Sequence, residues 1–588
     1  MINNIFMTGV TFSVSFLVVG IVIAVINSIK GNNKGEQIHT MNSIPENQNV
    51  VQPVGVPSQP QYPYPMPQYV APAFIPKENI RKTRINELKA LPSDEKRAIV
   101  VIFTILLSVF FVDSISRTLG GFGSTLMFFS SQILLWYLFI QKGKGSKAKF
   151  LFLSIPILLT SLPFSLFTDS KGYFIPYMTL FVLLGLQIIL LSGISPIEVF
   201  SVESIALLLR RIIAVPIGNL NFFFKSLRIP KGNRNGKLRN LVLAFAGLLL
   251  AIPFLFLLIE LLTKADPIFK NMYDNFIKNL HLKITFGRFF SDIFLGFLLA
   301  IFSGAAIVYN LVDDNPEMPL VKQPTLSPIL GFSFTLVLNI LLGIFSFVQI
   351  KYLFIGNTYN EIIEKIGYSQ YAREGFFELC YASSIVFVLA ILVLALCKKN
   401  DKNPIYIRIS IIFMSLFSGV LAVSSVKRMM LYIFEHGLSV KRVSTLFGTT
   451  VILTALFWLL VKCIFTKLKA IKTIGISIVV LVMLFSYVNI DRLVSSYNTN
   501  KYISGELTPD IEYYKQLSYT AVVDAAKLYN YATEMKRAQF PPVKIRRLET
   551  FLFYAKKDFD NRDLFSYTVD DIKIKEAFES LPTEILPD

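Results

Sequence analysis

The chain is poor in the residues that build most soluble catalytic and metal sites. Its 588 residues include three cysteines, three histidines and two tryptophans, and charged residues make up only 16%. Cys380, Cys397 and Cys463 form no CxxC pair, so the sequence supports neither a zinc site nor a disulfide framework. It also holds no HExxH motif and no Walker-type phosphate loop. We therefore assign no catalytic residue, no metal ligand and no cofactor-binding residue.

Long apolar runs account for the shortage of charge. A soluble domain carries roughly 25% charged residues, and this chain carries 16%. Hydrophobic residues make up 53% of it. About 20 apolar residues suffice to cross a bilayer. Twelve runs approach or exceed that length: 5–29, 98–112 (extended at most to 119), 121–140, 150–168, 173–195, 241–262, 290–312, 328–350, 379–397, 405–426, 443–461 and 474–490. The sequence predicts an all-α polytopic membrane helix bundle of eleven or twelve spans.

The net charge of +19 is explained by basic residues in the loops between spans, and we do not take it as a sign of nucleic-acid binding. One alternating set of loops holds 29 lysine and arginine residues and the opposite short loops hold 14. The positive-inside rule then places the richer set in the cytoplasm, with both chain termini outside. We expect the basic loops to contact anionic lipid, and we expect no nucleic-acid partner.

The first 97 residues divide into an anchor and a linker. Residues 1–29 read as an N-terminal transmembrane anchor, and residues 30–97 as a cytoplasmic proline- and glutamine-rich linker that ends in a basic segment. Proline density within Ile44–Pro76 rules out helix or sheet and favours polyproline II. This stretch is either a plain spacer or a ligand for a proline-recognising protein partner.

The remaining chain divides into four regions. Residues 98–195 form four spans, and residues 241–490 form seven. Between them, residues 196–240 carry a segment, Glu198–Arg211, whose polar residues share one helical face, so we expect a helix lying in the membrane interface. A further pair of short spans is the alternative. Residues 491–588 form a small helical extracytoplasmic C-terminal domain.

One helix of that domain has a recognisable start. Thr508 can cap it, Pro509 suits its first position, and apolar residues follow at helical spacing from Ile511 to Leu528. We expect one helix over this stretch.

Basic, aromatic and acidic residues recur at the outer ends of the later spans. Arg428, Tyr432 and Glu435 share one helical face, and similar residues flank the neighbouring spans. Such groups can pair across helices or bind a polar headgroup, and both interpretations stay open. The predicted polar cluster comprises Lys351, Tyr352, Arg373, Glu374, Arg428, Tyr432, Glu435, Arg442, Asp491 and Arg492.

The same segments carry a family resemblance. The stretches "FVQIKYLFIG…YAREGFFEL", "LYIFEHGLSVKR", "NIDRLVSSYN" and "ADPIF" resemble a bacterial family of multi-pass proteins, domain of unknown function 4173, with 4153 relatives. The resemblance covers roughly Leu241 to Leu528. It implies a location in the bacterial plasma membrane and brings no substrate or catalytic residue.

Three classes of function are compatible with these observations. The first is a non-catalytic membrane protein that binds or translocates a small molecule or a lipid-linked envelope component. The second is a sensor or assembly partner that recruits proteins through the proline-rich arm and the outer tail. The third is an outer-face enzyme using Glu374, Glu435 or Asp491 as an acid or base, although no nucleophile–base pair accompanies them.

Overall fold

A computed structural model describes most of the chain from residue 94 onward. The described residues are 94–117, 120–142, 145–168, 171–193, 198–218, 220, 223, 262, 266–269, 271–272, 286–312, 326–351, 368–397, 403–534, 541–562 and 566–582. The predicted anchor, the proline-rich linker and all but the last residue of the predicted span 241–262 lie outside this set.

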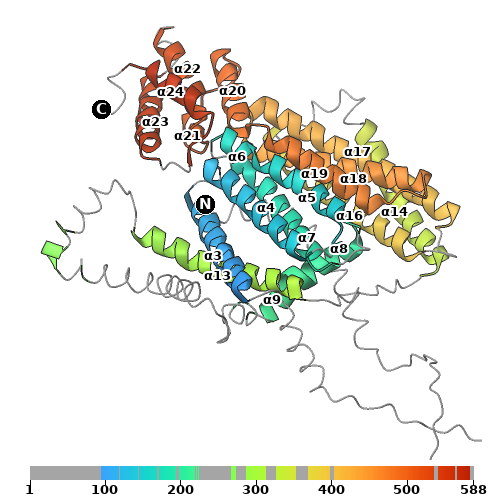
Figure 1. The fold of residues 1–588 in the computed structure, drawn as a ribbon. Coiled ribbons are helices and arrows are strands. Elements are labelled where there is room, and N and C mark those ends of the chain that lie inside the picture. The colour runs from blue at the N-terminus through green and yellow to red at the C-terminus, as the bar shows by residue number, and fades with distance from the viewer. Residues whose placement is uncertain are drawn as a thin grey trace, which may run out of the picture. The chain divides into compact units, whose positions relative to one another are not determined.

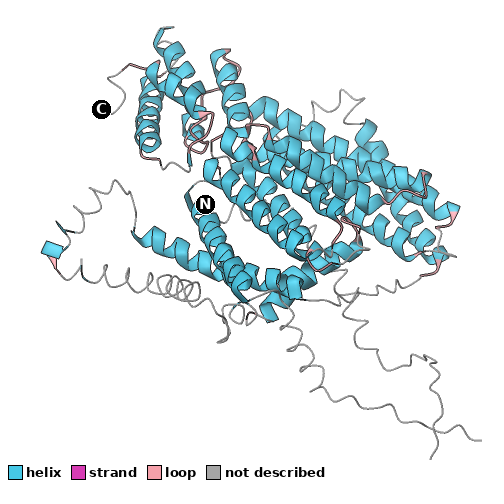
Figure 2. Cartoon of the chain, in the orientation of Figure 1, coloured by secondary structure: helices cyan, strands magenta, loops and turns pink. Residues whose placement is uncertain are grey.

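The described residues are mostly helical and contain no strand (Figures 1 and 2). Glycines in the left-handed region, among them Gly437 at φ 76°, end helices at tight turns. The principal helices are α3 (Asp94–Arg117), α4 (Phe122–Lys142), α5 (Lys147–Ser161), α6 (Pro163–Leu166), α7 (Phe174–Leu190), α8 (Val202–Leu208), α9 (Val215–Gly218), α13 (Phe286–Val312), α14 (Pro328–Gln349), α16 (Tyr368–Leu396), α17 (Ile405–His436), α18 (Val440–Ile464), α19 (Ala470–Ser486), α20 (Ile490–Ile503), α21 (Ile511–Tyr514), α22 (Ala521–Glu534), α23 (Pro542–Asp560) and α24 (Asp571–Glu579).

Length and composition confirm the prediction of an all-α polytopic membrane bundle. Within the described residues, seven helices are long and apolar enough to cross a membrane. An eighth span results if α19 and α20, which meet at a 57° bend, count as one. Two predicted spans contain only shorter apolar helices, Phe103–Asp113 and Phe174–Leu190. The described part therefore does not reach the eleven or twelve spans that hydropathy suggested.

Buried amides join three helices of the first membrane region. The side chains of Gln132 on α4 and Gln187 on α7 exchange hydrogen bonds of 2.8 and 3.0 Å. Gln187 also donates to the hydroxyl of Ser154 on α5, which in turn accepts from the indole of Trp136. Phe128, Phe150 and other apolar side chains bury this network. In an apolar interior these bonds fix the relative positions of the helices, because no water is there to replace them.

Hydroxyl groups run along the contacts of α17 with its neighbours α14, α16 and α18. The Ser410 hydroxyl donates to Thr335 on α14 at 2.7 Å, and the Asn339 amide donates to the Ser410 carbonyl at 2.8 Å. Small and hydroxyl-bearing residues at these positions let the helices approach closely. At 32 residues, α17 is about 48 Å long and so exceeds a hydrocarbon core of about 30 Å.

The C-terminal helices α20–α24 form a domain with its own core, here called the tail domain. Tyr514, Leu528, Leu552, Phe559 and Ile574 are among its buried side chains. Backbone hydrogen bonds fasten this domain to one end of the membrane helices: Phe122 N to Tyr567 O at 3.0 Å, Val569 N to Ser165 O at 3.0 Å and Asp570 N to Leu166 O at 3.0 Å.

The predicted helix start at Thr508 is wrong. α21 begins at Ile511 and is capped by the Asp510 side chain, which accepts from Tyr513 N. The chain then turns through residues 515–520 before α22 begins at Ala521. The Asp491 carboxylate accepts a hydrogen bond from Ser518 N within this turn, a long-range contact that helical spacing alone does not reveal.

Replacement of Gln187 by leucine should destabilise the membrane helices. The change leaves the buried Gln132 amide without its partner, at a cost of about 1–3 kcal/mol. The measurement is the thermal unfolding temperature of the full chain in detergent micelles, which should fall. The double change Gln132→Leu and Gln187→Leu removes both amides and should recover part of the loss. A double variant that is less stable than either single variant would contradict this account of the pair.

Candidate functional site

The described members of the predicted polar cluster separate into three groups. Lys351 ends the last turn after α14 and is exposed. Arg373 and Glu374 lie in the first turns of α16, but their side chains fall outside the description, as does the whole of Tyr352. Of the other six residues, Glu435 is exposed, and the remaining five form contacts at three separate places, so these contacts do not gather them around one open cleft.

Arg428 is buried between three membrane helices. Its guanidinium donates to the Gln349 Oε1 atom of α14 at 3.4 Å, and only 9% of the residue is exposed. It also lies against α16 at Gly375, where an added Cβ would come within 2.8 Å of the Arg428 Cζ atom and closer still to Nη1. The absence of a side chain at Gly375 is therefore what makes room for the charge.

Tyr432 and Arg442 stabilise the turn between α17 and α18. The Arg442 guanidinium lies over the Tyr432 ring, 4.2 Å from its centroid, and donates to the carbonyls of His436 and Gly437. These carbonyls end α17, where a cation is favoured by the helix dipole. Glu435 is exposed on the same turn. This group holds the turn, and the Arg442 Nη1 donors are used by its carbonyls.

Asp491 and Arg492 belong to the joint between α19 and the tail domain. Asp491 is 1% exposed and accepts from Ser518 N at 3.0 Å. Arg492 donates to Asp570 Oδ1 at 3.4 Å, and Asn489 donates to the other oxygen of Asp570 at 3.1 Å. Of the three carboxylates considered for an outer-face enzyme, Glu435 is exposed, Asp491 is buried, and the side chain of Glu374 lies outside the described residues.

Asn498 of α20 connects the tail domain to the α17–α18 turn by hydrogen bonds. The Asn498 side chain accepts from Leu438 N at 2.7 Å and donates to Leu438 O at 2.9 Å. Gly437, which precedes Leu438, has a φ of 76°, and a Cβ added at Gly437 would lie 2.7 Å from Asn498 Oδ1. The Tyr513 hydroxyl accepts from Val440 N at 3.0 Å, and burial raises the pKa of that hydroxyl.

A hollow lies beside α17 and α18 and is here called the lateral groove; the sequence does not predict it. It has a volume of about 430 Å³. Gly419 gives it depth, because a Cβ at that position would meet nothing within 4 Å. Its lining is apolar apart from Ser415, and consists of Ile350, Ser415, Leu416, Gly419, Val420, Val423, Leu453, Leu456, Phe457 and Leu460. The only signal in the sequence was a glycine in an apolar run, which hydropathy does not distinguish from its neighbours.

Basic residues stand at one end of the lateral groove. Val423 and Lys427 are four residues apart on α17 and so share a face, and Lys427 is half-buried. Ile350 lines the groove and Lys351 follows it directly. Lys427 thus lies one turn beyond the lateral groove on the same face of α17, and Lys351 follows a groove residue in the chain.

The single polar face predicted for the segment 198–211 is not present in the structure. Arg211 is 4% exposed, donates to Asn310 Oδ1 of α13 at 3.2 Å and lies near the Tyr309 ring. A π-helical stretch, Leu209–Ala214, follows α8 and shifts the side-chain register. As a result Ser204 and Arg211 face inward while Arg210 is exposed, so they do not form one common polar face.

Alanine at Gly375 should destabilise the bundle, whereas alanine at Gly419 should not. The first change forces Arg428 out of its position, and overpacking of this kind costs about 1–3 kcal/mol. The second adds a methyl group to open space and removes a flexible helical glycine, worth about 0.5–1 kcal/mol in favour of folding. Thermal unfolding of both variants in nanodiscs tests the contrast. Equal unfolding temperatures would show that Gly375 does not confine Arg428.

Comparison with known proteins identifies a family and no characterised relative. No curated protein matches the chain, and no solved structure does. A model of the family described as "Domain of unknown function (DUF4153)" matches residues 154–528. This match begins at residue 154, well before Leu241, from which the motifs predicted the resemblance. The family matched is 4153, and the number 4173 is not confirmed. The chain belongs to the DUF4153 family.

Proposed function

We propose that this chain is a non-catalytic protein of the bacterial plasma membrane that binds an anionic lipid or lipid-linked envelope component in the lateral groove. The observation that carries the proposal is an apolar groove beside α17 and α18 with Lys427 one turn beyond it on the same face of α17. Translocation has less support, because a polar-lined cavity at the membrane midplane is what a transporter would use, and the lateral groove is apolar.

The lining of the lateral groove suits a hydrocarbon chain. Protein atoms bordering an unfilled void lose their dispersion contacts, so an apolar groove at the depth of the bilayer is filled most favourably by a lipid chain. From Leu416 to Val423 the groove follows two turns of α17, about 11 Å of helix. Ser415 lies at its wall, and the hydroxyl finds no hydrogen-bond partner among the described residues.

The lysines at the end of the lateral groove suit an anionic headgroup. Lys427 and Lys351 lie next to the last groove residues on α17 and α14, Val423 and Ile350. A basic residue near the membrane surface contributes about 1 kcal/mol to the attraction of anionic lipid. Chain and headgroup would then be recognised by adjacent parts of one site.

A second candidate is a membrane sensor or assembly partner. The observation that favours it is the Asn498 clamp, because a partner bound to the tail domain would act directly on the α17–α18 turn. The proline-rich stretch Ile44–Pro76 would supply a further docking segment on the other side of the membrane.

Filling the lateral groove should displace the bound lipid. Gly419→Leu places a side chain in the open space of the groove, and we expect at least a fivefold loss of co-purifying anionic lipid, measured by native mass spectrometry of the full chain. Ile340→Phe is the matched control, since Ile340 is 58% exposed on α14 and does not line the groove. Lys427→Gln should shift the retained lipid from anionic to neutral species. Unchanged lipid in Gly419→Leu would refute the proposed site.

A further inference from the structure

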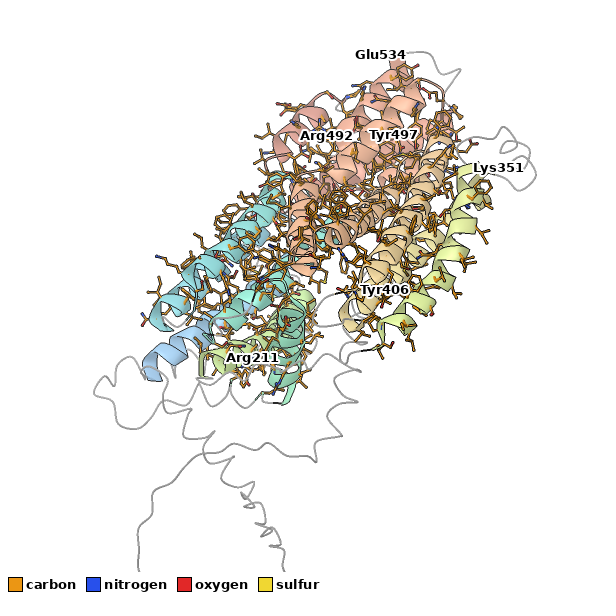
Figure 3. The ribbon with its side chains drawn as sticks, turned by 90° about the vertical axis from the view of Figure 1, so that its right-hand side faces the viewer. Arg211, Lys351, Tyr406, Arg492, Tyr497 and Glu534 are labelled. Carbon is orange, nitrogen blue, oxygen red and sulfur yellow. The ribbon has the colours of Figure 1, made fainter. Side chains whose placement is uncertain are left out.

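A second hollow lies on the tail domain, between α20, α22 and α24. This tail groove has a volume of about 730 Å³ and a mixed polar and apolar lining. Figure 3 labels Arg492 near the joint with the membrane helices and Glu534 at the far tip of the domain. The lining residues are Arg492, Ile503, Val523, Ala526, Lys527, Asn530, Tyr531, Glu534, Lys573, Glu576, Ala577 and Ser580.

The helices that form the tail groove run in the same direction, away from the membrane helices. α22 begins beside the end of α6, where Thr520 and Thr168 share a hydrogen bond. α24 begins where Asp570 N bonds to Leu166 O. α20 follows α19 directly and runs alongside α22, as the bonds Ser495–Asp524, Lys527–Asn500 and Tyr531–Ile503 show.

This shared direction gives the tail groove a fixed order of charge. On α22, Lys527 comes two turns before Glu534, and on α24, Lys573 comes one turn before Glu576. Each wall therefore places its lysine closer to the membrane helices than its glutamate. All four side chains are exposed, and none of them forms an ion pair within the described part of the chain. Arg492 is already paired with Asp570, whereas Lys527 donates only to the neutral Asn500 side chain. The two lysines are therefore the cations of the tail groove without a carboxylate partner among the described residues.

The floor and the hydrogen-bonding groups of the tail groove suit a polypeptide backbone. Ala526 and Ala577 are buried and small, which lets a backbone approach closely. Asn530 and Ser580 offer donors and acceptors along the walls. Lys527 and Glu534 are seven residues apart on α22, about 10 Å along the helix, which is the length of about three extended residues.

We propose that the tail groove binds a short peptide with a free C-terminal carboxylate, with that carboxylate directed toward the membrane helices at Lys573 and Lys527. The peptide amino terminus is then directed toward Glu576 and Glu534. This site is separate from the lateral groove and does not rest on lipid binding there. It makes the tail domain a receptor for peptide ends.

The test uses the full chain in nanodiscs and a pooled random tripeptide library with free termini. After affinity capture of the nanodiscs, mass spectrometry measures peptide enrichment. We expect enrichment from the free-terminus pool, and at least a tenfold reduction for an otherwise identical pool with amidated C-termini. Lys573→Gln combined with Lys527→Gln should give a similar reduction. Arg546→Gln, an exposed position on α23 outside the tail groove, is the matched control and should enrich as the unmodified chain does.

Two results would overturn the proposal. One is that the folded chain, checked by its unfolding temperature, enriches neither peptide pool. The other is that the amidated pool is enriched as strongly as the free-terminus pool, or that the lysine variant enriches peptides as strongly as the unmodified chain. Either form of the second result would mean that the groove does not recognise the carboxylate. Because the two sites are distinct, Gly419→Leu should lose lipid from the lateral groove without changing peptide enrichment. The lipid proposal and the peptide proposal can therefore fail independently.

Discussion

The paired hydrogen bonds between Asn498 and the backbone of Leu438 connect the two parts of the molecule. Asn498 belongs to α20, a wall of the tail groove, and Leu438 belongs to the turn between the two helices that line the lateral groove. An asparagine amide that donates to and accepts from one residue fixes both distance and orientation. Movement of α20 therefore requires either movement of the α17–α18 turn or loss of both bonds.

Polar groups inside the bundle serve mainly to position helices. Gln132 with Gln187, Ser410 with Thr335, and Arg428 with Gln349 each join helices that are distant in sequence. In hydrocarbon an unsatisfied polar group costs several kcal/mol, so such pairs restrict which helices can pack together. The buried Arg428 is the most demanding case, since it needs an acceptor on α14 and an empty position at Gly375 on α16.

The sequence predicted the helices well because hydropathy is a local property. Runs such as 121–140 and 443–461 were placed close to α4 and α18 because each contains enough apolar residues to span a bilayer by itself. Partners of the polar residues were not predictable in this way. Arg428 and Gln349 are 79 positions apart, and Asp491 finds Ser518 across a turn that the sequence read as continuous helix. Arg211 was misplaced because a π-helical stretch changes the register that a regular helix would keep. The lateral groove depends on a side chain that Gly419 lacks, and such an absence has meaning only once neighbours are known.

The parallel course of α20, α22 and α24 has an electrostatic consequence for the joint. Three helices present their N-terminal ends, each equivalent to about half a positive charge, toward the membrane helices. Aspartates occupy these ends: Asp491 on α20, Asp524 on α22, and Asp570 and Asp571 on α24. Because these four carboxylates are buried, dissolved ions screen them only weakly. Helix dipoles and carboxylates therefore compensate one another inside the tail domain, next to the backbone hydrogen bonds that attach it, and this compensation should hold across a wide range of ionic strength.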